Sequence, residues 1–328
     1  MKALLIAGGF GTRMRPLTFT RPKHLLPIAN RPHIDHVFDK LQRHGVNECV
    51  LLTSYLADAF DATVRSAGER GMSVEVAHEP TPLGTAGALK NAAGLLGNET
   101  FLALNGDVLT DADLDALVDF HRARKAQGTI LLTPVEDPTQ FGVVPTADDG
   151  RVEAFIEKPP AGEAPTNMIN AGVYVLETSV LERIPVEQEY SAERELFPGL
   201  VAESSLFAWA TDSYWLDVGT SDKYLKANMD ALSGDYVVDE VSLRAEGSNV
   251  IGDGANIDST ASVSRSCVGA GASIGPGAKV EGSVLLPDVS VGDKAVVSGA
   301  ILGEGVRVEA GATVDGATVG DGERVGVS

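Results

Sequence analysis

Cysteine is scarce in this sequence of 328 residues, which contains only Cys49 and Cys267. Two cysteines can build neither a disulfide framework nor a four-ligand zinc site, so we expect both thiols to be reduced and structural. Long apolar runs are also missing, because no stretch approaches the roughly 18 residues that span a bilayer. The short apolar run at residues 4–7 leads into glycines instead of a signal-peptide cleavage site. We therefore expect a cytoplasmic protein with no membrane partner.

Acidic residues are absent from the first 34 positions, although the whole chain carries a formal net charge of −20. The acid-free segment contains six basic side chains, namely Lys2, Arg13, Arg15, Arg21, Lys23 and Arg31. Because this segment contributes +6, the remaining residues sum to −26. A chain this acidic repels phosphate backbones, so we expect no nucleic-acid partner. A basic, glycine-containing segment within it predicts a binding site for phosphate groups.

Up to about residue 232, short apolar runs alternate with patterns of helical spacing. We expect strands at 2–7, 49–53, 73–76, 101–104 and 129–133, and helices at 34–41, 57–66, 85–96 and 114–121. Strand–helix alternation of this kind predicts an α/β domain with a Rossmann-like, doubly wound mixed sheet, mostly parallel. Ligands of such sheets bind at the carboxyl ends of the strands. Residues 8–9, 80–87 and 105–107 fall at such ends.

The second half of the chain has a different periodicity. From Ile251 onward, branched apolar residues recur in steps of six, six and five, which gives a repeat of 17 residues. The positions are Ile251, Ile257, Val263, Val268, Ile274, Val280, Leu285, Val291, Val297, Leu302, Val308, Val314, Val319 and Val325. This repeat predicts a left-handed parallel β-helix of hexapeptide-type repeats, with one inward side chain per face. We therefore divide the chain into a catalytic domain at 1–232, a linker at 233–245 and a β-helix at 246–328.

Histidine is missing from the repeat region, since all six histidines occur at or before His121. Hexapeptide acyltransferases resemble this type of β-helix, but they use a histidine as general base. The missing histidine argues against acyl transfer by this domain. Turnover of acetyl-CoA by residues 246–328 alone would support that function again. We expect the β-helix to support homo-oligomerisation or regulation instead.

The acid-free segment contains the pattern Ala7-Gly8-Gly9-Phe10-Gly11-Thr12-Arg13-Met14-Arg15-Pro16-Leu17-Thr18, followed by Arg21-Pro22-Lys23. It lacks the third glycine of the dinucleotide fingerprint, and it is not a P-loop. It resembles the signature of the sugar nucleotidyltransferases, which join a nucleoside triphosphate (NTP) to a sugar-1-phosphate and release pyrophosphate. The resemblance runs through the whole chain. It implies that Arg13 and Lys23 hold the triphosphate and offset charge in the transition state, with Asp107 as a third catalytic residue. The nucleotide-binding residues that it implies are Ala7, Gly8, Gly9, Gly11, Thr12, Arg13, Gly84, Thr85 and Asn105.

Two short segments disagree about which nucleotide is used. Residues 82–87, Pro-Leu-Gly-Thr-Ala-Gly, resemble the base-recognition turn of the mannose-1-phosphate guanylyltransferases. Their glycines would let backbone amides reach a purine edge, although a plain helix N-terminus with Thr85 near the cap is the alternative. Residues 27–30, Pro-Ile-Ala-Asn, are closer to some thymidylyltransferases with long C-terminal tails. We expect GTP and mannose-1-phosphate as substrates, with thymidylyl or uridylyl transfer to glucose-1-phosphate as the alternative.

Two aspartates stand in patterns that the resemblance assigns to metal binding. Asp107 ends Asn105-Gly106-Asp107, and Asp217 lies within Trp215-Leu216-Asp217-Val218-Gly219. Carboxylates at a phosphate site are suitable ligands for Mg²⁺, which takes few protein ligands beside substrate oxygens. A noncatalytic regulatory subunit of the same fold, the alternative of another class, would be expected to lose Arg13, Lys23 or one of these aspartates. This chain keeps all of them.

The remaining motifs resemble the sugar-phosphate pocket of the same family. They imply that Gly142, Glu157, Lys158 and Asn170 bind the sugar phosphate. Glu157 would accept hydrogen bonds from hydroxyl groups, Lys158 would meet the phosphate and Gly142 would donate its amide. A solvated Glu157–Lys158 pair beside a proline turn is the alternative. We expect the acidic residues of segment 190–198 to lie on a helix face and not to act as ligands.

Overall fold

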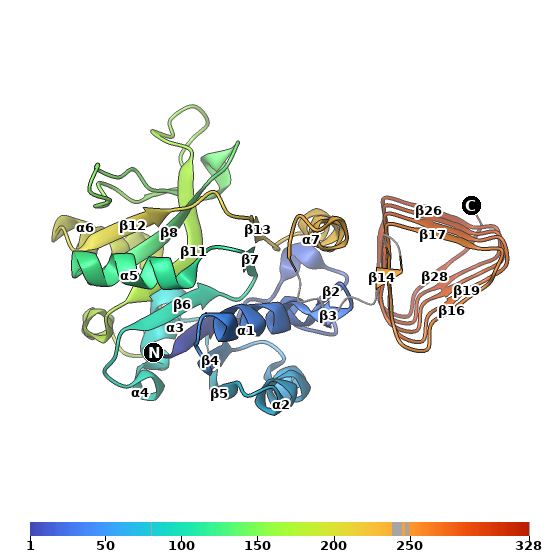
Figure 1. Cartoon of the computed structure of the whole chain (residues 1–328), viewed down its shortest axis with the longest axis horizontal. Helices are drawn as coiled ribbons and strands as arrows, with labels where there is room; N and C mark the ends of the chain where they lie inside the picture. The colour runs from blue at the N-terminus through green and yellow to red at the C-terminus, as the bar shows by residue number, and fades with distance from the viewer. Residues whose placement is uncertain (80, 238–244, 247–248, 328) are drawn as a thin grey trace. The chain divides into compact units, whose positions relative to one another are not determined.

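The computed structural model describes residues 1–79, 81–237, 245–246 and 249–327, which form two compact units (Figure 1). The first unit contains Met1–Gly9 and Val37–Trp215, and the second contains Phe10–His36 and Leu216–Ser328. The signature segment after Gly9 is therefore grouped with the β-helix. Residues 238–244, which make up much of the expected linker at 233–245, lie outside the described residues.

The first unit is built on a mixed sheet in the order β10-β9-β11-β6-β1-β4-β5, with β8 beside β11 and β12 beside β8. The strands are β1 (Ala3–Ile6), β4 (Glu48–Thr53), β5 (Ser73–His78), β6 (Phe101–Asn105), β8 (Gly128–Pro134), β9 (Gly142–Val143), β10 (Ile156–Glu157), β11 (Met168–Leu176) and β12 (Leu206–Ala210). β6, β1, β4 and β5 run parallel, as the mostly apolar sequences of β6, β1 and β4 predict. β11 runs antiparallel to β6, β8 and β9. The mixed sheet is confirmed, and β11 is the strand that joins its two halves.

Helices connect these strands. They are α1 (His33–Arg43), η3 (Ala57–Phe60), α2 (Asp61–Glu69), α3 (Gly84–Asn91), α4 (Ala93–Leu96), α5 (Leu114–Arg124), η4 (Pro138–Gln140), η5 (Thr178–Arg183), η6 (Ala192–Leu196) and α6 (Phe197–Ala202), and the short strand β7 (Val108–Thr110) precedes α5. The helix expected over 85–96 is divided at Ala92. Gly94, a poor helix former, follows this break, and the Leu95 N–H bonds the Ala92 carbonyl three residues back.

The second unit combines the signature segment, one long helix and the β-helix. Its first elements are η1 (Thr12–Met14), η2 (Lys23–Leu25), β2 (Pro27–Ile28), β3 (Arg31–Pro32), β13 (Trp215–Asp217) and α7 (Ser221–Ser233). β2 and β3 form a hairpin whose two turn residues, Ala29 and Asn30, both have left-handed backbone angles (φ 49° and 62°). Two positive φ angles are what a tight two-residue hairpin requires.

The β-helix is made of strands that stack into three sheets (Figure 1, orange to red), and all described pairs are parallel except that of β14 with β15. Its strands are β14 (Ala245–Glu246), β15 (Asn249–Ile251), β16 (Asn256–Ile257), β17 (Ser262–Ser264), β18 (Cys267–Val268), β19 (Ser273–Ile274), β20 (Lys279–Glu281), β21 (Val284–Leu285), β22 (Ser290–Val291), β23 (Val296–Ser298), β24 (Ile301–Leu302), β25 (Arg307–Val308), β26 (Thr313–Asp315), β27 (Thr318–Val319) and β28 (Arg324–Val325). Parallel pairing places Ile251 beside Val268, which in turn lies beside Leu285. All 14 repeat positions lie on strands and pack into one apolar core. The repeat of 17 residues is confirmed, and the three sheets agree with the expected left-handed β-helix.

Within the described residues, no helix is long and apolar enough to cross a membrane.

Candidate active site

The loops that follow β1 and β6 leave the same edge of the central sheet. β1 and β6 pair in parallel, with Ile6 opposite Asn105, and the Gly106 N–H donates to the Ile6 carbonyl at 3.0 Å. The predicted nucleotide-binding residues 7–9 therefore lie beside the loop that contains Asp107. This is the edge at which a sheet of this kind binds ligands.

A buried carboxylate, Glu79, lies at the same edge, and the sequence patterns did not single it out. Its side chain is 8% exposed, and its Oε1 accepts the Leu83 N–H at 2.7 Å. A β-carbon added to Gly8 would lie 3.0 Å from Glu79 Oε2 and 3.0 Å from Ser54 Oγ, so glycine leaves room for this carboxylate beside the β1 loop. Burial raises the pKa of Glu79 above its usual range. The clue in the sequence was an acidic residue directly after a strand, a pattern common to many turns.

The Pro-Leu-Gly-Thr-Ala-Gly segment continues from Glu79 into α3. Gly84 has a φ of +71°, and a β-carbon there would lie 2.8 Å from the Tyr190 carbonyl oxygen. The Ala86 and Gly87 amides donate to that same carbonyl, each at 3.0 Å. Close packing against Tyr190 thus explains Gly84, and the Ala86 and Gly87 amides are bound to protein. Contact of Gly84 and Thr85 with a base stays a prediction.

Glu193 connects this turn to the predicted sugar-phosphate residues. The Thr85 hydroxyl donates to Glu193 Oε2 at 2.6 Å, and the Ser191 hydroxyl donates to the same oxygen at 2.9 Å. Glu195 differs, because its carboxylate accepts the Ser191 N–H at the start of η6. The acidic residues expected on a helix face therefore have distinct partners. Glu193 is directed at Thr85.

The predicted sugar-phosphate residues also come together in the first unit. Gly142 pairs with Glu157 across β9 and β10, and a β-carbon on Gly142 would lie 3.1 Å from Glu157 Oε2. Lys158 Nζ is 3.8 Å from Glu157 Oε1. Burial, followed by the negative charge of Glu193, raises the pKa of Glu157. A carboxyl group whose pKa is raised by burial and a neighbouring charge is a candidate for a functional site.

Tyr174 is a buried phenol on β11 that contacts Asn170. Asn170 Nδ2 donates to the Tyr174 hydroxyl oxygen at 2.8 Å. Burial raises the pKa of Tyr174, and the charges of Glu193, Glu157 and Asp107 act in the same direction. Of the predicted sugar-phosphate residues, Asn170 is therefore the one whose side chain contacts the buried Tyr174 phenol.

Asn105 lies beside the bulge of β11. Gly172 has a φ of +73°, and a β-carbon there would lie 2.7 Å from Asn105 Nδ2. The Gly172 N–H donates to Asn170 Oδ1 at 3.0 Å. The Asn-Ala-Gly segment at 170–172 is therefore shaped by its own side chain and by the close approach of Asn105.

In the second unit, the signature loop folds back on itself. Gly11 has a φ of +61°, and a β-carbon there would lie 3.3 Å from the Lys23 β-carbon. The Thr18 hydroxyl donates to the Gly11 carbonyl at 2.8 Å, and Thr12 begins η1 directly after Gly11. The stem of Lys23 therefore packs against the glycine turn that precedes Arg13.

Arg13 and Asp217 also lie close together in this unit. A β-carbon on Gly219 would lie 2.7 Å from Arg13 Nη2 and 3.0 Å from Asp217 Oδ1, and Lys223 Nζ is 3.3 Å from Asp217 Oδ2. Sequence analysis missed Lys223, which follows Asp217 by six residues in the first turn of α7. Carboxylate oxygens are the hard donors that Mg²⁺ takes. Asp217 therefore offers the type of ligand that a magnesium ion requires.

The Pro-Ile-Ala-Asn segment at 27–30 contacts protein instead of offering its side chains to a base. Asn30 Nδ2 donates to the Val268 carbonyl at 2.7 Å, and the Ala29 N–H donates to Asn228 Oδ1 at 3.0 Å. The Tyr224 hydroxyl donates to the Pro27 carbonyl at 2.6 Å. Because these contacts join the hairpin to α7 and the first coils of the β-helix, they account for the pattern at 27–30 structurally.

Comparison with known proteins matches two family models. The nucleotidyl transferase model covers residues 2–234, and the GMPPB C-terminal domain model covers residues 245–328. Mannose-1-phosphate guanylyltransferase of Mycobacterium tuberculosis is 40% identical over 262 residues, which is 79% of this chain and 72% of that protein. Mannose-1-phosphate guanylyltransferase catalytic subunit beta of Xenopus tropicalis is 38% identical over 229 residues, 69% of this chain and 63% of that protein.

Solved structures are similar in fold. A putative glucose-1-phosphate thymidylyltransferase from Bacillus anthracis, in complex with a sucrose, has a TM-score of 0.66 at 25% identity and covers 74% of this chain and 98% of its own. HddC from Yersinia pseudotuberculosis, complexed with GMP-PN, has a TM-score of 0.59 at 27% identity and covers 69% of this chain and 97% of its own.

Proposed function

This chain belongs to the nucleotidyl transferase family, and on that premise we propose that it condenses GTP with mannose-1-phosphate to GDP-mannose and pyrophosphate. The observation that carries the choice of substrates is the 40% identity to a mannose-1-phosphate guanylyltransferase. A second relative, the mannose-1-phosphate guanylyltransferase catalytic subunit beta of Xenopus tropicalis, supports the same choice at 38% identity.

The reaction needs no covalent intermediate on the enzyme. An oxygen of the sugar phosphate attacks the α-phosphorus of the nucleotide in line, and pyrophosphate departs. Arg13 and Lys23 would hold the triphosphate and stabilise the charge that grows on the leaving group. The packing of the Lys23 stem on Gly11 supports this role, because it holds the ammonium group beside the loop that begins η1.

We propose Asp107 and Asp217 as the ligands of Mg²⁺, an assignment taken from the family resemblance. The bound ion would neutralise phosphate charge at the reacting phosphorus. The carboxylate of Asp217, which lies near Arg13 in the second unit, supports this assignment. The place of Asp107 beside the β1 loop supports it from the first.

We propose that the sugar phosphate binds at Gly142, Glu157, Lys158 and Asn170. Glu157 would accept hydrogen bonds from sugar hydroxyls, and Lys158 would pair with the phosphate. The pairing of Gly142 with Glu157 and the proximity of Lys158 support this pocket. Asn170 would act together with Tyr174, whose hydroxyl oxygen its amide contacts.

The direct test is pyrophosphate release over a grid of the common NTPs and sugar-1-phosphates in the presence of Mg²⁺. We expect the highest kcat/KM with GTP and mannose-1-phosphate. An optimum with dTTP or UTP and glucose-1-phosphate would replace the proposal with the alternative. Absence of turnover with every pair would favour a noncatalytic subunit.

We propose that the carboxylate of Glu79 binds the guanine base, and a substitution of this residue tests how GTP is selected. Guanine presents N1–H and N2–H donors on one edge, and a carboxylate accepts both, whereas an amide opposes one of them with its own NH₂ group. Glu79→Gln is therefore expected to lower kcat/KM for GTP about tenfold to a hundredfold, the scale of a bidentate base contact of about 1–3 kcal/mol. kcat/KM for ATP should fall less, so the preference for GTP over ATP should become smaller.

The matched control is Glu69→Gln, at the end of α2, which should leave both values unchanged. Because burial raises the pKa of Glu79, GTP affinity should be lost on acidification at a higher pH than an ordinary carboxyl would give. Equal losses for GTP and ATP would assign Glu79 to the fold instead of the base.

We also propose that the protein is cytoplasmic and forms a homo-oligomer through the β-helix. The family model that matches residues 245–328 as a distinct C-terminal domain supports a separate role for this region. Light scattering on the full chain would give the oligomeric state, and a monomer at micromolar concentration would contradict the second proposal.

A further inference from the structure

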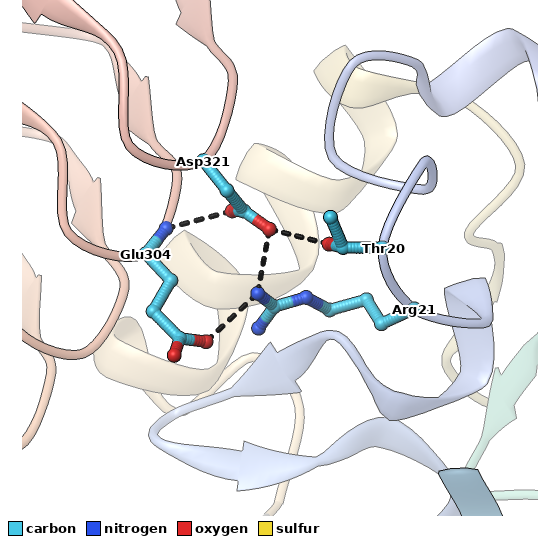
Figure 2. A network of polar contacts seen from close by, with 4 residues as sticks. All are labelled: Thr20, Arg21, Glu304 and Asp321. Atoms are coloured by element: carbon cyan, nitrogen blue, oxygen red, sulfur yellow. Dashed lines mark hydrogen bonds and ion pairs between the residues drawn. The ribbon is translucent and has the colours of Figure 1, made fainter. Parts of the chain in front are cut away.

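A cluster of four residues joins the signature segment to the last coils of the β-helix (Figure 2). Arg21 Nη2 donates to Asp321 Oδ2 at 2.7 Å and to Glu304 Oε2 at 2.8 Å. The Thr20 hydroxyl donates to the same Asp321 oxygen. Glu304 and Asp321 stand one coil apart, and the Glu304 N–H donates to Asp321 Oδ1 at 2.8 Å. We call these four residues the Arg21 cluster.

The Arg21 cluster is largely shielded from solvent. The side chains of Arg21 and Asp321 are 18% and 17% exposed, and that of Glu304 is 48% exposed. A β-carbon on Gly320 would lie 3.1 Å from the Pro16 β-carbon, so the backbone of the last coils approaches the signature segment closely. Shielded ion pairs with hydrogen bonds hold geometry better than solvated ones. The guanidinium of Arg21 is therefore bonded to the β-helix through its Nη2 atom.

A short, stiff stretch of chain connects Arg21 to Lys23. Pro22 has a φ of −60° and caps η2, in which the Leu25 N–H donates to the Pro22 carbonyl at 3.0 Å. On the far side, Asn30 donates to the Val268 carbonyl in the first coils of the β-helix. Lys23 thus lies between two attachments to the same rigid domain.

We propose that the Arg21 cluster is a positioning device for the transferase reaction, through which the β-helix holds Lys23 in register with the triphosphate. Arg21 is a positioning residue that acts through Lys23. The inference rests on the proposed function of Lys23 as a triphosphate ligand, and it is independent of which base or sugar is used. It makes the β-helix part of the catalytic apparatus in addition to any role in assembly.

The central variant is Asp321→Asn, because asparagine keeps an oxygen for the Glu304 N–H and removes the charge that holds Arg21. We expect kcat to fall about tenfold, less than the hundredfold that follows a misplacement of about 1 Å. KM for the sugar phosphate should stay within about twofold of wild type, since its pocket lies elsewhere. The control is Asp293→Asn, at an exposed corner of another coil, which should leave kcat unchanged.

Combination with Lys23→Ala separates positioning from general damage to the fold. If Arg21 acts through Lys23, Asp321→Asn should lower kcat by less than about twofold in the Lys23→Ala background, because coupled residues are not additive. A full tenfold loss in both backgrounds would overturn the proposal, as would wild-type kcat in the single variant. Should Asp321→Asn fail to fold, Glu304→Gln at the more exposed carboxylate repeats the test with a smaller expected loss.

The experiments distinguish a failure of the positioning role from a failure of the proposed function. If the wild-type protein prefers another NTP and sugar-1-phosphate, the same variants are measured with that pair, because Lys23 would contact the triphosphate common to all. A wild-type protein without turnover would reject the proposed function. An active wild type with an equally active Asp321→Asn variant would reject the positioning role alone.

Discussion

Lys23→Ala is expected to lower kcat at least about a hundredfold, the scale of losing one preorganised electrostatic contact to the transition state. Lys23 follows the glycine turn of the signature, and its stem packs on Gly11. Alanine keeps the backbone of η2 and removes only the stem and the ammonium group. Initial rates of pyrophosphate release at saturating substrates provide the measurement.

Lys279→Ala is the matched control for this variant, because Lys279 is an exposed lysine on β20 of the β-helix. It should keep wild-type kcat, and circular dichroism should be the same for both variants. Added propylammonium should restore part of the lost rate in Lys23→Ala and none in the control. Near-normal turnover of Lys23→Ala would remove Lys23 from the reaction.

Asp107→Asn is expected to cost at least about a hundredfold in turnover as well, for a different reason. Asparagine has nearly the same shape but lacks the charge that a hard divalent ion requires. The loop of Asp107 is held by the bond from the Gly106 N–H to the Ile6 carbonyl, which the substitution leaves intact. The loss should therefore come with a higher Mg²⁺ concentration for half-maximal rate.

Asp148→Asn, in an exposed loop, is the control for this second variant and should keep wild-type kcat and Mg²⁺ dependence. A loss of turnover at Asp107 with unchanged Mg²⁺ dependence would assign the residue a role other than metal binding. If both Asp107→Asn and Lys23→Ala turned over at near-normal rates, the assignment as a sugar nucleotidyltransferase of this type would fail.

Local regularities in the sequence predicted the β-helix almost completely. Each coil repeats the same 17-residue pattern, and neighbouring coils pair in register, so local periodicity and tertiary contact carry the same information. The parallel strands β1, β4 and β6 of the first unit were predictable for a similar reason, because burial on both faces demands continuous apolar runs. β12, which is parallel to β8, was not predicted. β11 was missed, since an antiparallel strand with a bulge at 170–172 has no such regular pattern.

The residues of the candidate site also fall into two groups, those that local motifs predicted and those that only the structure revealed. Arg13 and Lys23 were predicted from a long motif and Asp217 from the separate segment at 215–219, and the structure adds Lys223 beside Asp217. Glu79 was missed because its neighbour Gly8 is distant in sequence.

The segment 27–30 was interpreted as evidence on the nucleotide, although its residues bond to α7 and the β-helix. A sequence pattern shows which functional groups a segment contains, but it does not show whether they contact a ligand or another part of the protein.

The sequence by itself determined the reaction class and the two architectures, because glycine-rich turns, basic residues and a strict apolar repeat each act through near neighbours in the chain. The tertiary structure decided what the other basic residues of the acid-free opening do. Arg21, equivalent to Lys23 in charge, is bonded to carboxylates about 300 residues away, at Glu304 and Asp321. The sequence gives the charge of each side chain. The partner of that charge depends on the distant segments that folding brings within hydrogen-bond distance.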